Sequence, residues 1–212
     1  VTSLLNTNTP LCGDLTYNWE VTYQSTSGCT PATSSYSFTN GTSATSREPR
    51  FLFTNPGVYT IRPLIIAPLS SCSTWLPSQQ VIVKGRPVVA LGALPANICV
   101  GQSLSPTASA SCYLDASSTY AWSFPGASPS AASTLNPGSI TYNTAGSAVI
   151  TLAVTNECGT TSQNTNVTVN PTPVIQTVSD KVLCHGESTG AINFSTTPAA
   201  GVAVSWTNSN TS

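Results

Sequence analysis

The sequence predicts an all-β protein in which β-sandwiches follow one another along the chain. Residues 142–159 place an apolar side chain at every second position after a Gly turn, which is typical of a half-buried strand. Residues 53–61 repeat the same order of aromatic residue, turn, Gly and alternating strand. A Trp recurs on the equivalent strand of each copy, where a large aromatic fills the middle of a two-sheet sandwich: Trp19, Trp122 and Trp206.

Two short joints rich in Pro and Gly divide the chain, at residues 85–87 and 170–173. We therefore expect three domains in 212 residues. Residues 1–84 form a sandwich that lacks its first strand, residues 85–170 form a complete one, and residues 171–212 are the N-terminal part of a third. Short, stiff joints leave little room to fold back, so the sequence predicts an elongated rod.

The composition excludes several classes of partner. Charged residues make up 6% of the chain, against about 25% in an average domain, and the net charge is -1. No basic field is present to hold nucleic acid or anionic lipid. No apolar run approaches the roughly 18 residues of a membrane span, so membrane insertion is not expected. The chain contains no Met and begins without a signal peptide, which is typical of a piece of a longer, processed polypeptide.

Catalytic and metal-binding patterns are missing from the sequence. The single histidine, His185, has no nucleophile motif around it, so we expect a turn residue, no enzyme activity and no cofactor. The carboxylates do not cluster, and a weak calcium site at Asp14 or Asp115 is the alternative to having no metal. Trp75 is a candidate ligand contact on a loop, and the alternative is that it covers a disulfide at the neighbouring Cys72.

Several motifs resemble the PKD-like, immunoglobulin-type repeats of very large Bacteroidota cell-surface proteins. In the second copy these are Cys99-Val100-Gly101-Gln102, residues 120–126, residues 136–142 and residues 154–159. In the first copy, residues 42–49 and 55–61 are similar to the same family. Residues 184–192 and 206–210 resemble a sister repeat, so the resemblance covers essentially the whole chain.

This resemblance implies tandem seven-stranded sandwiches, export by type IX secretion and attachment outside the cell as an outer-membrane-attached surface filament. In the best-known members that filament is the gliding-motility adhesin. The implied function is a non-catalytic structural or adhesive segment. Its implied partners are the type IX secretion and cell-surface attachment machinery, with surface polysaccharide as a further candidate. Two alternatives stay open, namely carbohydrate-binding modules and spacers in a secreted hydrolase.

Seven cysteines without paired C-x-x-C motifs indicate disulfides in an oxidising compartment rather than zinc ligands. In an immunoglobulin-type sandwich, the loop before the Trp strand and the loop after the sixth strand lie at one pole. The bridges expected on that basis are Cys12–Cys72 and Cys112–Cys158, which leaves three cysteines unpaired within the chain: Cys29, Cys99 and Cys184.

Overall fold

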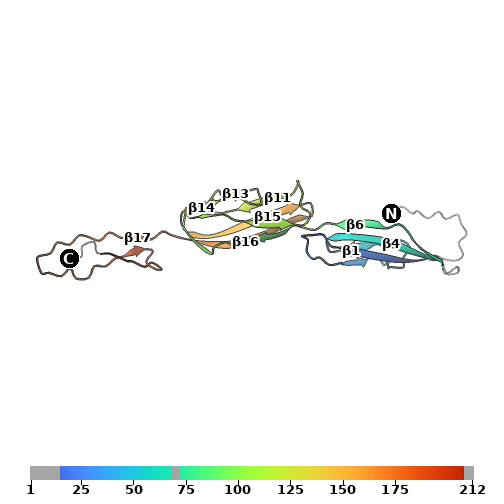
Figure 1. Ribbon diagram of the computed structural model, residues 1–212, viewed down its shortest axis with the longest axis horizontal. Coiled ribbons are helices and arrows are strands. Elements are labelled where there is room, and N and C mark those ends of the chain that lie inside the picture. The colour runs from blue at the N-terminus through green and yellow to red at the C-terminus, as the bar shows by residue number, and fades with distance from the viewer. Residues whose placement is uncertain (1–14, 68–71, 208–212) are drawn as a thin grey trace.

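The computed structural model describes residues 15–67 and 72–207. All secondary structure in these ranges is β-strand, with turns and loops between the strands and no helix. Three groups of strands follow one another along the longest axis of the molecule (Figure 1). The predicted all-β class is therefore confirmed. The expected strand at residues 1–9 and the cysteine Cys12 lie outside the described residues.

The first group of strands forms two sheets, in which the long strand β4 is central. It pairs antiparallel with β1 along one edge and with both β5 and β6 along the other. A two-stranded sheet of β2 and β3 completes the group. The bounds are β1 (Thr16–Gln24), β2 (Tyr36–Phe38), β3 (Phe51–Phe53), β4 (Gly57–Ala67), β5 (Cys72–Trp75) and β6 (Gln79–Val83).

Aromatic rings fill the space between these two sheets. Tyr59 is fully buried, and its ring lies 4.4 Å from that of Phe53 and 5.0 Å from that of Tyr23. Trp19 packs edge-on against Phe51 with 6.1 Å between centroids. Its indole N–H donates to the carbonyl oxygen of Ser46 at 2.8 Å, so the polar edge of the ring is satisfied inside the sandwich.

The second group forms a sandwich of one five-stranded sheet, in the order β13-β11-β15-β16-β8, and two shorter sheets, β12-β14-β9 and β10-β7. The pairs are antiparallel except for β16 with β8. The bounds are β7 (Val88–Leu91), β8 (Asn97–Cys99), β9 (Ser103–Leu104), β10 (Ala108–Ser111), β11 (Thr119–Ser123), β12 (Ala127–Ser128), β13 (Ala131–Ala132), β14 (Ile140–Tyr142), β15 (Gly146–Asn156) and β16 (Gly159–Asn170).

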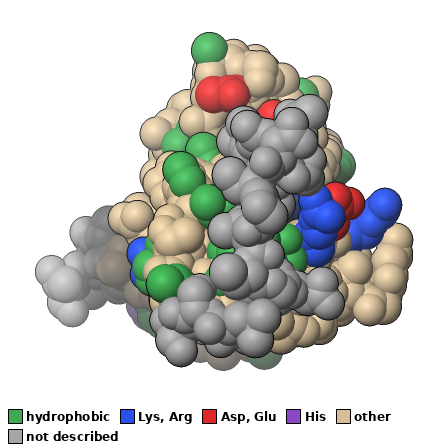
Figure 2. Space-filling model, turned by 90° about the vertical axis from the view of Figure 1, so that its right-hand side faces the viewer, with side chains coloured by type: hydrophobic (Ala, Val, Ile, Leu, Met, Phe, Trp, Pro, Cys, Tyr) green, Lys and Arg blue, Asp and Glu red, His purple; other side chains and the backbone are tan. Residues whose placement is uncertain are grey.

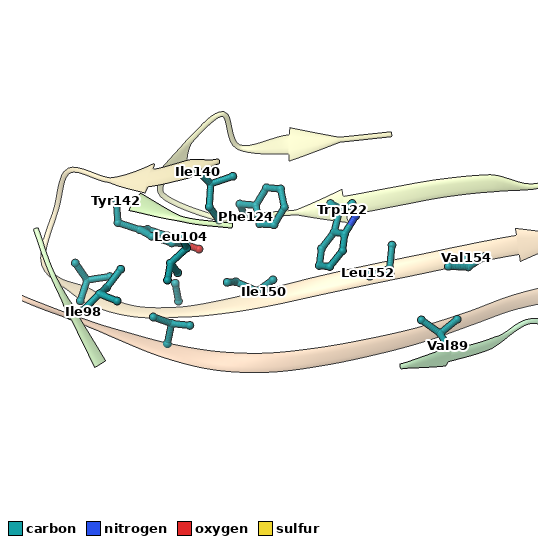
Figure 3. Packing of buried hydrophobic residues seen from close by; sticks show 13 residues of the cluster. Val89, Ile98, Leu104, Trp122, Phe124, Ile140, Tyr142, Ile150, Leu152 and Val154 are labelled. Atoms are coloured by element: carbon teal, nitrogen blue, oxygen red, sulfur yellow. The ribbon is translucent and has the colours of Figure 1, made fainter. Parts of the chain in front are cut away.

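The core of this sandwich follows the predicted alternation along β15. The side chains predicted to point inward are all buried: Ala148, Ile150, Leu152 and Val154. They form one buried cluster with Leu104, Ile140 and Tyr142 of the opposite sheet and with Trp122 and Phe124 (Figure 3). The Trp122 ring is 3% exposed and stacks on Phe124 with centroids 5.4 Å apart. Its N–H donates to the carbonyl oxygen of Thr134, as that of Trp19 does to Ser46.

The repeat read from the sequence is thus a structural repeat. In both copies a three-residue strand and a Gly turn lead into an eleven-residue central strand, at β3–β4 and at β14–β15. Gly57 and Gly146 begin these central strands with φ near +150°, which side chains rarely adopt. At Gly57 a Cβ would also lie 2.3 Å from the Tyr23 ring, so only glycine fits there.

The third group is a single two-stranded sheet of β17 (Val174–Ile175) and β18 (Thr196–Thr197). The prediction that Trp206 fills a core is wrong for this structure, because its side chain is 76% exposed. Within residues 171–207 no second sheet faces β17 and β18, so the apolar side chains there have no layer to pack against. The boundaries 1–84, 85–170 and 171–212 remain predictions, although every strand pair among the described residues falls within one of these ranges.

One end of the molecule carries few charged side chains. Viewed end-on from the first group of strands, the described part of this face shows hydrophobic side chains and a few charged ones among uncharged atoms (Figure 2). In the described part of the chain, no helix is long and apolar enough to cross a membrane.

Candidate functional site: a cross-linked joint between two sandwiches

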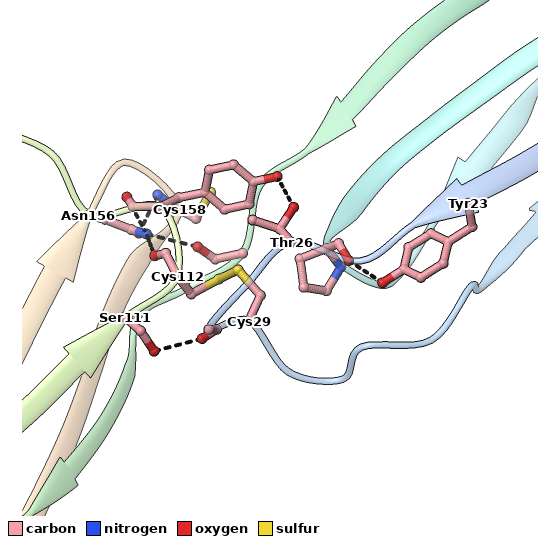
Figure 4. The surroundings of a disulfide bond; sticks show 11 residues. Tyr23, Thr26, Cys29, Ser111, Cys112, Asn156 and Cys158 are labelled. Atoms are coloured by element: carbon pink, nitrogen blue, oxygen red, sulfur yellow. Dashed lines mark hydrogen bonds between the residues drawn. A yellow bond between two sulfur atoms is a disulfide. The ribbon is translucent and has the colours of Figure 1, made fainter.

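The main chemical feature of the molecule is a disulfide between Cys29 and Cys112, which joins the first two sandwiches (Figure 4). The predicted Cys112–Cys158 bridge is therefore wrong, and so is the prediction that Cys29 has no partner within the chain. We call the surrounding contact region the joint. It comprises four short segments: residues 26–29, 84–86, 111–113 and 156–158.

The course of the first sandwich places Cys29 at this contact. Strand β1 ends at Gln24, which pairs with Val58 at the start of β4, so the turn that follows lies at the end of the sandwich facing the second one. The N–H of Cys29 donates to the carbonyl oxygen of Thr26 and closes that turn. Gly28 supplies the left-handed step, with φ of +76°.

The second sandwich presents a matching turn directly after β10. Its residues Cys112 and Tyr113 both have positive φ, 73° and 51°, which is uncommon for residues other than glycine. Two hydrogen bonds between the sandwiches flank the disulfide. The Ser111 hydroxyl donates to the carbonyl oxygen of Gly28 at 2.7 Å, and the hydroxyls of Thr26 and Tyr113 lie 2.8 Å apart. The disulfide therefore lies beside two hydrogen bonds that also connect the two sandwiches.

Asn156 ties the linker to the second sandwich from inside. Its side-chain N–H group donates to the carbonyl oxygen of Gly85 at 2.8 Å and lies 3.3 Å from that of Cys112. Its carbonyl oxygen accepts the N–H of Cys158 at 2.9 Å. Asn156 is the only buried polar residue in the described part of the chain, and these partners satisfy both ends of its amide.

Charge and close packing also hold the linker in place. Lys84 forms an ion pair with Glu157, and the hydrogen bond between these two side chains raises the pKa of Lys84. A Cβ on Gly85 would lie 3.1 Å from the Cys112 sulfur, and one on Gly28 would lie 2.7 Å from the Ser111 side chain. A side chain at Gly28 would therefore displace Ser111, and one at Gly85 would require its neighbours to shift by a few tenths of an ångström.

We expect Asn156→Ala to lower the free energy of unfolding by about 1–3 kcal/mol, because it leaves buried backbone groups without partners. Denaturant unfolding of the full chain measures this loss. Asn164→Ala on β16, where the side chain is exposed, is the matched control and should change stability by less than about 0.5 kcal/mol. Equal effects of the two substitutions would contradict the role given to Asn156.

The remaining cysteines fall into two groups. Cys99, Cys158 and Cys184 form no disulfide within the described residues, and the absence of a partner for Cys99 and Cys184 in the whole chain stays a prediction. Cys72 lies on β5, and its predicted partner Cys12 is outside the described residues, so the Cys12–Cys72 bridge stays a prediction.

The candidate metal and ligand residues also have definite places. The Asp115 carboxylate accepts hydrogen bonds from the hydroxyl and N–H of Ser117, which lower the pKa of Asp115 and identify it as a turn residue. Among the described residues no three metal-ligating side chains cluster, and Asp14 lies outside them. His185 is exposed in a turn closed by Cys184 and Glu187. Trp75 lies on a strand, β5, rather than on a loop.

The joint does not follow from the sequence, because the bridges expected there lie within one sandwich. The available signal was Cys29 itself, an extra cysteine without a counterpart in the second copy, in a chain with an odd cysteine count. Thr26, Ser111 and Asn156 carried no signal, because their residue types are abundant throughout this chain.

No protein-family model matches the chain, and no curated protein matches it. Several solved structures are similar to it. The amphioxus IgVJ-C2 molecule has 19% identity and a TM-score of 0.35, covering 76% of this chain and 92% of that one. The fibronectin(III)-like modules of Clostridium thermocellum CbhA have 18% identity and a TM-score of 0.33, covering 73% and 86%.

Three N-terminal domains of the bacteriophage RB49 highly immunogenic outer capsid protein (Hoc) have 15% identity and a TM-score of 0.34, covering 82% of this chain and 53% of that one. Similarities with TM-scores this low carry no argument about this chain. The strand pairing and the two-layer core described above show the fold, which is an all-β chain of immunoglobulin-like sandwiches.

Proposed function

We propose that this chain is a non-catalytic structural or adhesive segment of a large secreted protein, in which cross-linked sandwiches act as a stiff spacer. The observation that carries the proposal is the joint. A disulfide, two flanking hydrogen bonds and the Lys84–Glu157 ion pair connect the first two sandwiches. Contacts between neighbouring domains of one chain are by default weak enough to allow relative motion. A covalent bond at this position restricts that motion.

The disulfide also supports an extracellular location, because such bonds persist in oxidising compartments. From the resemblance of the motifs we extend the proposal to a filament on the cell surface, attached at the outer membrane. Its partners would be the type IX secretion and attachment machinery, and its process gliding motility or surface adhesion. The low charge supports this extension, since a surface of hydroxyl and amide groups suits a spacer that binds few charged partners.

Small-angle X-ray scattering of the oxidised chain tests the proposal. We expect an elongated particle, and we expect the Cys29→Ser variant to show a broader distribution of shapes, because only hydrogen bonds and one ion pair then hold the joint. Cys184→Ser removes a cysteine that forms no disulfide within the described residues and should leave the scattering unchanged. A compact particle, or identical scattering from wild type and Cys29→Ser, would contradict the stiff-spacer function.

A further inference from the structure

A row of three side chains crosses the outer face of the first sandwich. Glu20 on β1 pairs directly with Arg62 on β4, and Trp75 on β5 pairs with Leu64, two residues further along β4. Since successive side chains alternate between the faces of a strand, all three side chains lie on the face opposite to the buried Tyr59. We call Glu20, Arg62 and Trp75 the outer row.

The outer row is held in one arrangement by its own contacts. The guanidinium carbon of Arg62 lies 4.1 Å from the centroid of the Trp75 ring, and the Arg62 side chain is ion-paired with Glu20. Arg62 therefore fixes one face of the ring, while 44% of the Trp75 surface stays exposed. A ligand that stacked on the other face of the ring would bind a side chain that is already held in place. Binding would therefore lose less side-chain conformational entropy.

We propose that the outer row is a binding site for a neutral polysaccharide chain. The face of an indole ring is electron-rich and attracts the weakly positive C–H groups on the flat side of a sugar ring. Beside it, the side chains of Arg62 and Glu20 are 42% and 40% exposed. The guanidinium has further N–H donors and the carboxylate has further lone pairs, which can bind neighbouring sugar hydroxyls.

The charge of the outer row selects a neutral ligand. Arg62 and Glu20 cancel, so the row has no net charge, and the outward side chains on either side of the ion pair along β1 are uncharged: Asn18 and Thr22. A nucleic acid could stack a base on Trp75, but its affinity depends on cations that contact phosphates, and none is free here. The row spans two interstrand spacings, roughly 10 Å, which favours a chain of sugars over a single one.

Native affinity electrophoresis of the full chain tests this site. The gels contain one soluble polymer each, either neutral (mannan, a β-1,3-glucan or xylan) or charged (alginate). We expect at least one neutral polymer to retard the chain and alginate to leave its mobility unchanged. Trp75→Ala should weaken the interaction about tenfold or more, whereas Trp75→Phe should retain part of it because a ring remains.

Trp206→Ala is the matched control, because it removes a more exposed Trp that lies outside the outer row. It should leave the retardation unchanged. Cys29→Ser should do the same, since the outer row lies within one sandwich, and this result separates the proposal from the stiffness of the joint. Unchanged far-UV circular dichroism establishes that Trp75→Ala is folded. Absence of retardation by all three neutral polymers, stronger retardation by alginate, or equal losses in Trp75→Ala and Trp206→Ala would overturn the proposal.

Discussion

Replacing Cys29 with serine will lower the melting temperature of the oxidised chain by on the order of 10 °C. The Cys29–Cys112 bridge closes a loop across a sequence separation of 83 residues, which contains strands of both sandwiches. Native disulfides typically contribute about 2–4 kcal/mol, and 1 kcal/mol corresponds to about 4–8 °C for a domain of this size. Differential scanning calorimetry without reductant measures the change.

Two variants control this experiment. Cys112→Ser removes the same bond from the other side and should give the same melting temperature as Cys29→Ser. Cys184→Ser leaves the bond intact and should melt like the wild type. In Cys29→Ser the freed Cys112 lies near Cys158, so the double variant with Cys158→Ser measures the loss without a replacement bridge. A melting temperature of Cys29→Ser equal to that of the wild type would show that the bond does not stabilise the folded chain.

Trp122→Ala will have the largest effect of any single substitution in the second sandwich. It empties the space between the two sheets, ends the stacking on Phe124 and leaves the carbonyl oxygen of Thr134 without its donor. Truncation of a buried Trp or Phe costs about 3–5 kcal/mol, which is a large part of the stability of a small domain. Guanidinium unfolding followed by near-UV circular dichroism measures the loss.

The control for this prediction is Val149→Ala on β15, in the same sheet. Its side chain is 47% exposed, on the face of the sheet that points away from Trp122. We expect a change of less than about 0.5 kcal/mol. A loss at Val149 comparable to that at Trp122 would mean that the two faces of this sheet have been assigned the wrong way round.

The fold was predictable where a local pattern determines burial. The alternation along β15 predicts its buried face because one side of each strand must pack against the second sheet. The same argument succeeds for Trp122 and fails for Trp206. Trp206 has the same local pattern, but residues 202–207 form no strand, and among the described residues no sheet covers the Trp206 side chain. Periodicity identifies which face would be buried, and a partner layer is needed to bury it.

The joint was not predictable for a different reason. The sequence argument placed Cys112 and Cys158 at one pole of the second sandwich, and the structure agrees, since Asn156 contacts both residues. Cys29 was expected to have no partner within the chain. In a tandem array, however, the end of one sandwich meets the facing end of the next. The partner of Cys29 depends on that contact between domains, which no local pattern encodes.

Peptide mapping of the unreduced chain tests the central claim most directly. Cleavage after Lys, Arg and Glu separates the relevant cysteines, because Glu157 lies between Cys112 and Cys158. The joint predicts that peptide 21–47, which contains Cys29, is linked to peptide 85–157, which contains Cys112, and that the Cys99→Ser variant keeps this link. Linkage of peptide 85–157 to the peptide that begins at Cys158 would contradict the joint and the stiff spacer inferred from it.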